Sequence, residues 1–197
     1  LTKVISLSEH FNATNICVVG CSSSIRPEEF LNIPGVNVVS GNNGKLFAVK
    51  ELLNGKTGLI LSKKNTRNEK FEEDIKISNF GKECRAFVKI QDGCDNFCSY
   101  CIIPRTRGNS RSRSHEEIIE EVKRLYKSDY RELVITGIDM GSYEDPNDDE
   151  YKLDDLIEDI IINTPDGYRI RISSLETSQM TQKLLDLFIN HSDKLVS

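Results

Sequence analysis

Three strand patterns alternate with three helix patterns in the second half of the chain, and this order constrains the fold most. Apolar runs predict the strands, and apolar residues spaced three or four apart predict the helices. The predicted strands cover residues 85–90, 132–138 and 168–175, and the predicted helices cover residues 115–127, 153–162 and 181–189. Successive units of this kind build a (β/α) barrel. We therefore predict an α/β protein whose second half is a partial (β/α) barrel of about three β-α units.

The third predicted strand, residues 168–175, is the last one in this pattern. The helix after it ends a few residues before the chain does. We therefore expect this strand to have an unpaired edge, which native proteins normally cover.

From residue 15 to about residue 56 the chain also alternates between strand and helix patterns. Strands are predicted at 16–19 and 36–39, and helices are predicted to open at Arg26 and to cover 45–53 before Gly55. This order predicts a small parallel sheet.

Residues 62–80 carry no sustained apolar period and few large apolar groups, which is typical of a linker. The predicted organisation is an amino-terminal domain at 1–61, a linker at 62–80 and a barrel domain at 81–197.

The loop after the first barrel strand contains Cys94, Cys98 and Cys101, a C-x3-C-x2-C spacing. Structural zinc takes four protein ligands, and ordinary electron-transfer clusters use four cysteines, so three close thiolates indicate an iron-sulfur cluster with one iron left open. Two alternatives are a zinc loop completed by Cys84 or His115, and three packed thiols. An open iron can bind a substrate or a cofactor.

Four arginines follow the cysteine loop within nine residues. They are Arg105, Arg107, Arg111 and Arg113. The guanidinium group binds phosphate oxygens and stacks on bases, so this segment is a candidate RNA contact, and it is also a candidate for holding a cofactor carboxylate. The alternative is a solvated loop whose arginines pair with acidic groups. The net charge of −5 gives no global attraction to nucleic acid.

The acidic run is interpreted as an exposed loop and not as a metal site, because it lacks calcium-loop spacing. It comprises Glu144, Asp145, Asp148, Asp149 and Glu150.

No apolar run is long enough to span a bilayer, and the first 15 residues lack the pattern of a secretory signal. We expect a cytoplasmic protein without a membrane partner. Its six cysteines are then ligands or buried thiols instead of disulfides. The sequence carries no indicator of oligomeric state.

The cysteine spacing, with Tyr100 just before the third cysteine, resembles the radical S-adenosylmethionine (SAM) enzymes. Residues 88–113 look like the methylthiotransferases of that group, and residues 133–143 and 169–176 resemble its MtaB-type branch, which acts on tRNA. Residues 18–42 resemble the amino-terminal domain of the same family.

The resemblance implies a reaction and a set of cofactors. Cys94, Cys98 and Cys101 would hold a [4Fe-4S] cluster whose open iron binds SAM, and Tyr100 would border the SAM adenine. One electron would split SAM into methionine and a 5′-deoxyadenosyl radical, which removes hydrogen from carbon 2 of the adenine. A sulfur on a second [4Fe-4S] cluster would be inserted there, and a second SAM would supply the methyl group.

The resemblance also implies contacts to SAM and partners. Thr136 and Gly137 would contact the SAM amine, and Ser174 and Glu176 are candidates for its ribose. The implied substrate is N6-threonylcarbamoyladenosine beside the tRNA anticodon, which becomes its 2-methylthio derivative. An anticodon-loop base is unpaired and therefore accessible. The electron donor would be a protein such as flavodoxin or ferredoxin.

The chain departs from the family pattern in several places. The second cluster needs three cysteines, and only Cys21 falls on a matching position, whereas Cys17 and Cys84 are interpreted as buried thiols. Thr177 and Ser114 stand where the family usually has proline. We interpret the chain as a fragment lacking both ends of the family sequence.

Other functions remain open at this point. The cluster loop is shared with methylthiotransferases that act on isopentenyl-adenosine in tRNA or on a ribosomal protein. The Gln91-Asp92 pair and Thr136-Gly137-Ile138 favour the MtaB-type branch. A non-catalytic module that retains one iron-sulfur site is the alternative from another class.

Overall fold

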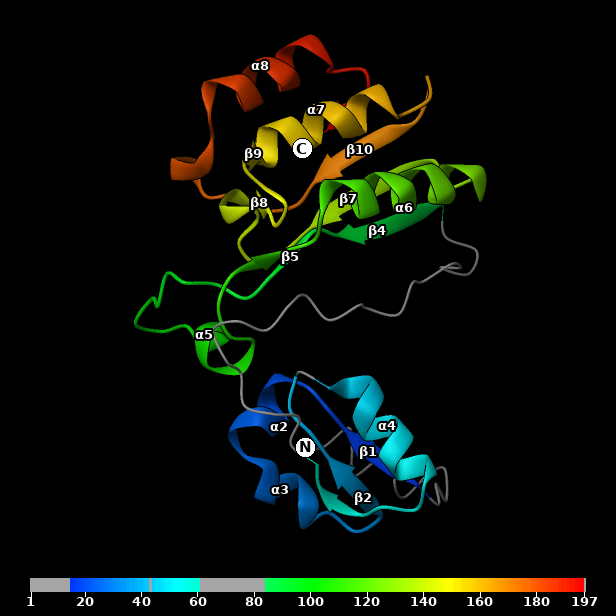
Figure 1. Ribbon diagram of the computed structural model, residues 1–197, viewed down its shortest axis with the longest axis vertical. Coiled ribbons are helices and arrows are strands. Elements are labelled where there is room, and N and C mark those ends of the chain that lie inside the picture. The colour runs from blue at the N-terminus through cyan, green and yellow to red at the C-terminus, as the bar shows by residue number, and fades with distance from the viewer. Residues whose placement is uncertain (1–14, 43, 61–83, 197) are drawn as a thin grey trace. The chain divides into compact units, whose positions relative to one another are not determined.

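The computed structural model describes residues 15–42, 44–60 and 84–196. The described residues form two compact units (Figure 1). One contains residues 15–60 together with Asp95–Asn109, and the other contains residues 84–94 together with Ser110–196. The predicted linker at 62–80 and both of its boundaries lie outside the described residues.

The amino-terminal unit contains a three-stranded parallel sheet in the order β1-β2-β3. Its strands are β1 (Ile16–Val18), β2 (Val36–Val39) and β3 (Gly58–Leu59), and its helices before residue 60 are α2 (Cys21–Ile25), α3 (Pro27–Leu31) and α4 (Lys45–Leu53). Both α3 and α4 pack against β2. The predicted parallel sheet is confirmed, and β3 and α2 are additional elements.

The second unit is built on a parallel sheet in the order β11-β10-β7-β4. The strands are β4 (Arg85–Lys89), β7 (Glu132–Thr136), β10 (Arg169–Ile172) and β11 (Leu195–Val196). Each crossover moves one strand further along the sheet in the same direction, as in a (β/α) barrel. The predicted α/β class and partial barrel are therefore confirmed.

The expectation that the third barrel strand has an unpaired edge is wrong. After the last helix the chain turns back, and Ile170 of β10 pairs with Leu195 of β11. Leu195 is buried, so a short apolar pair is enough to add a fourth parallel strand.

Three helices pack side by side in chain order against the sheet (Figure 1). They are α6 (His115–Lys127), α7 (Leu153–Ile162) and α8 (Gln182–Asn190), close to their predicted bounds. Ser114 caps α6, since its Oγ accepts the backbone N–H of Glu117 at 3.4 Å. The apolar faces of these helices and the alternate residues of the strands form one continuous core.

Short elements occupy the loops of the second half. They are β5 (Gln91–Asp92), α5 (Ile103–Thr106), β6 (Arg111–Ser112), η1 (Met140–Ser142), β8 (Glu144–Asp145), β9 (Asp148–Lys152) and η2 (Thr177–Gln179). Strands β8 and β9 pair as an antiparallel hairpin. The prediction of an exposed acidic loop is therefore wrong for Asp145, whose side chain is buried. Within the described part of the chain, no helix has the length and hydropathy of a membrane span.

Candidate cofactor and RNA site

The carboxyl ends of β4, β7 and β10 lie at one edge of the sheet, because Lys89 is in register with Thr136 and Ile172 with Ile135. The segments that follow these strands meet there. Gln91 and Gln179 each hydrogen-bond to Asp139, at 2.8 Å and 2.5 Å. The loops that follow these three strands therefore come together at one edge of the sheet.

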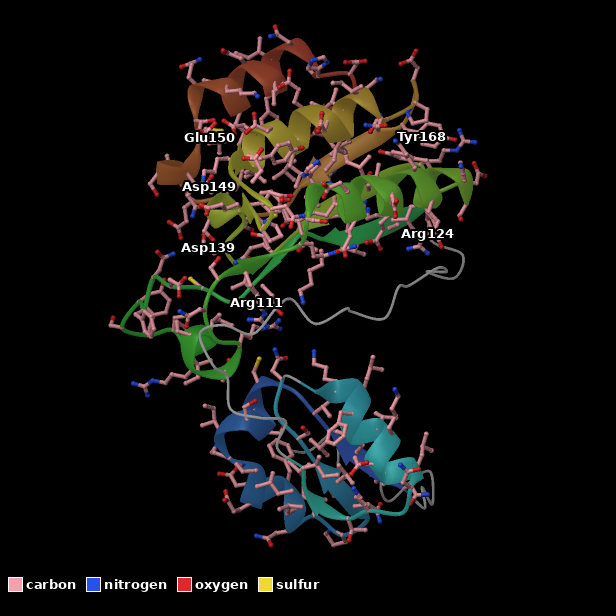
Figure 2. The ribbon with its side chains drawn as sticks, in the orientation of Figure 1. Arg111, Arg124, Asp139, Asp149, Glu150 and Tyr168 are labelled. Atoms are coloured by element: carbon pink, nitrogen blue, oxygen red, sulfur yellow. The ribbon has the colours of Figure 1, made fainter. Side chains whose placement is uncertain are left out.

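Cys94 leaves this edge through a fixed turn. Gly93 has a φ of 74°, a conformation that favours glycine, and its N–H donates to the Asp92 carboxylate at 2.8 Å. The half-buried thiol of Cys94 lies 3.6 Å from the Asp139 carboxylate (Figure 2 labels Asp139). The first cysteine therefore stands beside the turn that follows β7.

Cys98 and Cys101 belong to the tight part of the loop. The Cys101 N–H donates to the Cys98 carbonyl at 2.9 Å, and Phe97 just before Cys98 takes a positive φ of 46°. Cys98 is exposed and Cys101 is half-buried, whereas the Tyr100 side chain is 89% exposed. Thiols and an aromatic ring on the solvent side of a loop are accessible to a cofactor.

The donor set fits a [4Fe-4S] cluster. Three thiolates ligate three of the four irons and leave the fourth iron open to a small-molecule ligand. All three thiols are at least partly accessible. Cys94, Cys98 and Cys101 would hold the cluster, which would supply the electron that cleaves SAM.

The other predicted SAM contacts lie on the same edge. The Thr136 carbonyl accepts from the Ile90 N–H at 2.9 Å, so Thr136 is the last sheet residue before the turn. Gly137 has no room for a side chain, since a Cβ would stand 2.7 Å from the Met140 Cγ. Ser174 and Glu176 follow β10 and are exposed. The structure thus places all four at strand ends.

The four arginines divide into two pairs. Arg105 is exposed and Arg107 is half-buried. Arg111 (Figure 2) lies 3.5 Å from Asp92, and Arg113 donates to Glu121 at 2.6 Å and to the Lys89 carbonyl at 3.0 Å. The side chains of Arg111 and Arg113 are only 14% and 13% exposed. The second pair therefore makes ion pairs inside the fold.

The remaining cysteines belong to other segments of the chain. Cys21 is half-buried at the first position of α2. Cys17 is partly buried, and burial raises the pKa of its thiol. The prediction that Cys84 is buried is wrong, because Cys84 is exposed just before β4. A residue that only precedes a strand does not share that strand's core face.

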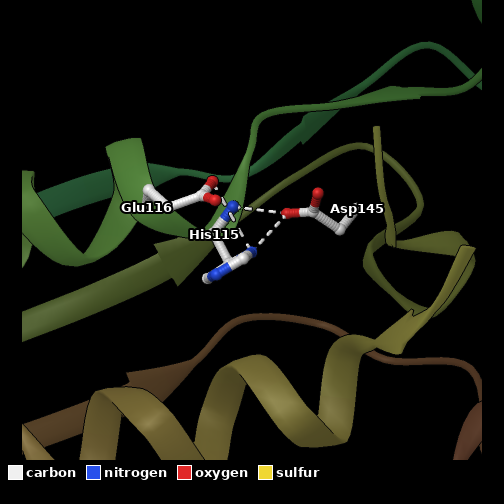
Figure 3. A group of neighbouring side chains, drawn as sticks. All are labelled: His115, Glu116 and Asp145. Atoms are coloured by element: carbon white, nitrogen blue, oxygen red, sulfur yellow. Dashed lines mark hydrogen bonds and ion pairs between the residues drawn. The ribbon is translucent and has the colours of Figure 1, made fainter. Parts of the chain in front are cut away.

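His115, Glu116 and Asp145 bring three potential ligand atoms within 4.8 Å of one another (Figure 3). The Asp145 Oδ2 accepts the His115 backbone N–H at 2.5 Å and lies 2.9 Å from the His115 Nδ1. The Tyr143 hydroxyl lies 3.4 Å from the same oxygen. Because protein donors surround this oxygen, we interpret the group as an anchor for the start of α6 and not as a metal site.

Burial alone would raise the pKa of the Asp145 carboxyl. The backbone N–H groups of Asn147 and His115 and the His115 ring hydrogen-bond to the carboxylate, and together they hold its pKa below the ordinary aspartate value. The hairpin β8-β9 therefore presents a stable negative charge to the positive end of α6.

The fold and the cysteine loop define a radical SAM protein. Residues 88–196 match the model of the Radical SAM superfamily, so the chain belongs to that superfamily. This stretch contains all three loop cysteines and the four parallel strands except the start of β4.

Three relatives show where the chain stands within the superfamily. It is 37% identical over 185 residues to the threonylcarbamoyladenosine tRNA methylthiotransferase MtaB of Bacillus subtilis, covering 92% of this chain and 40% of that protein. Two tRNA-2-methylthio-N(6)-dimethylallyladenosine synthases are also similar. That of Staphylococcus haemolyticus is 43% identical over 105 residues, covering 52% of this chain and 20% of its own length. The synthase of Rickettsia prowazekii is 28% identical over 187 residues, which cover 91% of this chain and 41% of that protein. The chain thus spans about two fifths of the length of the MtaB relative.

Sequence reasoning missed two polar residues of the site and the role of a third. Asp139 and Gln179 were not singled out, and Gln91 was noted only as part of a sequence pair. Asp139 lies three residues beyond the end of β7, so its position after a predicted strand was an available signal. Gln179 lies in η2, seven residues beyond β10, and its approach to Asp139 depends on tertiary contacts.

Proposed function

We propose that the chain is part of a radical SAM methylthiotransferase that converts N6-threonylcarbamoyladenosine, next to the tRNA anticodon, to its 2-methylthio derivative. The observation that carries this proposal is the 37% identity to a protein of that name over 92% of the chain. The cysteine loop supports it, because the reaction begins with SAM cleavage at a three-cysteine cluster.

Methylthiolation of isopentenyl-type adenosine is the second candidate. It is favoured by the 43% identity to a dimethylallyladenosine synthase, but over only 105 residues. Where a synthase of that kind matches nine tenths of the chain, the identity falls to 28%. The comparison over comparable lengths therefore supports threonylcarbamoyladenosine as the substrate.

Within this function each predicted residue has a role. Cys94, Cys98 and Cys101 bind the cluster, and Tyr100 covers the SAM adenine. The strand-end residues Thr136, Gly137, Ser174 and Glu176 bind the amine and ribose of SAM. Their location beyond the carboxyl ends of β7 and β10 supports these roles, because (β/α) barrels carry their chemistry at that edge.

The RNA contact is proposed for the arginine segment. Arg105 is the better candidate for phosphate binding, because its side chain is exposed, whereas Arg111 and Arg113 pair with carboxylates. We propose tRNA, SAM and an electron donor such as flavodoxin or ferredoxin as partners, and the cytoplasm as the location. A second cluster, to which Cys21 contributes, belongs to the same proposal.

Nucleoside mass spectrometry tests the substrate. A strain that lacks its own threonylcarbamoyladenosine methylthiotransferase is complemented with the complete gene that encodes this chain. We expect 2-methylthio-N6-threonylcarbamoyladenosine to reappear in bulk tRNA, and a Cys98→Ala variant to abolish it. If 2-methylthio-isopentenyladenosine accumulates instead, the second candidate is correct.

A further inference from the structure

Gln91 is a buried amide whose polar atoms are all used. Its side chain is fully buried in β5. The Oε1 atom accepts the backbone N–H groups of Ile138 at 3.0 Å and Asp139 at 2.8 Å. The Nε2 atom donates to the Gly93 carbonyl at 2.8 Å and to the Ser110 Oγ at 2.9 Å. A buried amide with both ends satisfied holds its partners in one geometry.

These partners come from three separate segments. Gly93 is the residue immediately before Cys94, where the cluster loop begins. Ser110 lies where that loop returns to the sheet, just before β6. Ile138 and Asp139 form the turn after β7. One side chain therefore ties the entry and the exit of the cluster loop to the turn that faces Cys94.

The packing around Gly137 fits the same role. A Cβ on Gly137 would stand 3.2 Å from both the Cβ and the Oε1 of Gln91. The turn can therefore approach Gln91 closely only because residue 137 is a glycine. Gln179 holds the other side of this turn, since its Nε2 donates to the Asp139 Oδ1 at 2.5 Å.

We propose that Gln91 is a positioning residue that sets the start of the cluster loop, at Gly93 and Cys94, and the turn after β7 at the separation needed for one SAM molecule to reach both. The proposal rests on the proposed binding of the cluster by Cys94 and of SAM by the turn at Thr136 and Gly137. Gln91 touches neither the cluster nor SAM in this role. It acts through Gly93, Ser110 and the backbone of Asp139.

The test compares three variants of the anaerobically reconstituted holoprotein. Gln91→Met removes all the hydrogen bonds and keeps a side chain of similar length. Gln91→Glu keeps an acceptor for the turn and loses the donors to Gly93 and Ser110. Gln182→Met is the matched control, because Gln182 is an exposed glutamine on α8 with a hydrogen bond to Asp186 at 2.8 Å.

SAM affinity and the change that SAM causes in the electron paramagnetic resonance spectrum of the reduced cluster are the readouts. We expect both Gln91 variants to keep the wild-type circular dichroism, to raise the Kd for SAM by about tenfold to a hundredfold, and to lose the SAM-induced spectral change. Loss of iron from a variant that keeps its fold also supports the proposal, since Cys94 would then be misplaced.

Two outcomes overturn the proposal. One is a wild-type Kd and spectrum in both Gln91 variants. The other is loss of the circular dichroism signal in both, which would make Gln91 a residue of stability only. These measurements use SAM without tRNA, so they are independent of which nucleoside the enzyme modifies, and a failure of the substrate assignment is seen separately in the nucleoside analysis.

Discussion

At the scale of single residues, the arginines after the cysteine loop have different surroundings although they share one sequence pattern. Arg113 is 13% exposed and pairs with Glu121, itself 12% exposed, whereas Arg105 is exposed. A charge already paired inside the fold is less available to phosphate than an exposed one. The two positions therefore respond differently to the same substitution.

Arg105→Ala is expected to weaken tRNA binding without changing stability. Loss of one phosphate contact makes the negative slope of log K against log salt concentration shallower by about one. Arg113→Ala is the contrasting variant, and we expect it to reduce the free energy of unfolding by about 2 kcal/mol because Glu121 loses its buried partner. Filter binding at several salt concentrations and urea denaturation measure the two effects. An unchanged salt slope in Arg105→Ala would remove Arg105 from the RNA interface.

Asp139→Asn is expected to raise the reduction potential of the cluster. The Asp139 carboxylate lies 3.6 Å from the Cys94 sulfur, and a nearby negative charge favours the oxidised cluster. Redox titration followed by electron paramagnetic resonance measures the potential. Asp149→Asn, an exposed change in the β8-β9 hairpin, is the control and should leave the potential unchanged. Equal potentials in all three proteins would contradict a charge effect of Asp139.

At the scale of elements, the start of α6 depends on a residue from another element. Asp145 of β8 accepts the His115 N–H at the first position of the helix, in addition to the cap by Ser114 (Figure 3). A carboxylate at a helix amino terminus accepts hydrogen bonds from free N–H groups and interacts favourably with the positive end of the helix dipole. The hairpin thus stabilises the helix that follows the arginine segment.

Asp145→Ala is expected to lower the free energy of unfolding by about 2 kcal/mol at pH 7, because the backbone N–H groups of His115 and Asn147 lose their acceptor. The pKa of Asp145 is depressed in the folded protein, so its contribution is present above the ordinary aspartate pKa and is lost as the pH falls through the lower folded value. The difference in the free energy of unfolding between Asp145→Ala and the wild type should therefore become smaller below about pH 4. Denaturation at several pH values measures it, with Asp149→Ala as the exposed control. A difference that does not change with pH would show that the charge of Asp145 is not involved.

At the scale of the whole molecule, three cysteines are proposed for the SAM-binding cluster, and Cys21 alone is proposed for a second one. The reconstituted 197-residue chain should therefore contain about four iron and four sulfide per polypeptide. Cys98→Ala should lose most of this iron, and Cys84→Ala, which changes an exposed cysteine outside the loop, should keep it. Analysis of iron, zinc and sulfide per polypeptide measures the content of each protein. Zinc in place of iron would contradict the cluster assignment.

The sequence by itself determined the class of the fold and pointed to the proposed cluster ligands. Both are local: alternating strand and helix patterns span consecutive residues, and Cys94, Cys98 and Cys101 lie within one short loop. The bounds of α4 and α7 were predicted as the structure has them, because each helix carries its own apolar pattern and end signals.

Only the tertiary structure decided how distant polar residues combine. Gln91 reaches Asp139 across 48 residues, Asp139 reaches Gln179 across 40, and His115 reaches Asp145 across 30. The pairing of β11 with β10 is also a contact between distant segments. Such contacts depend on which strands become neighbours and in which register, and the residue pattern of each segment on its own does not contain that information.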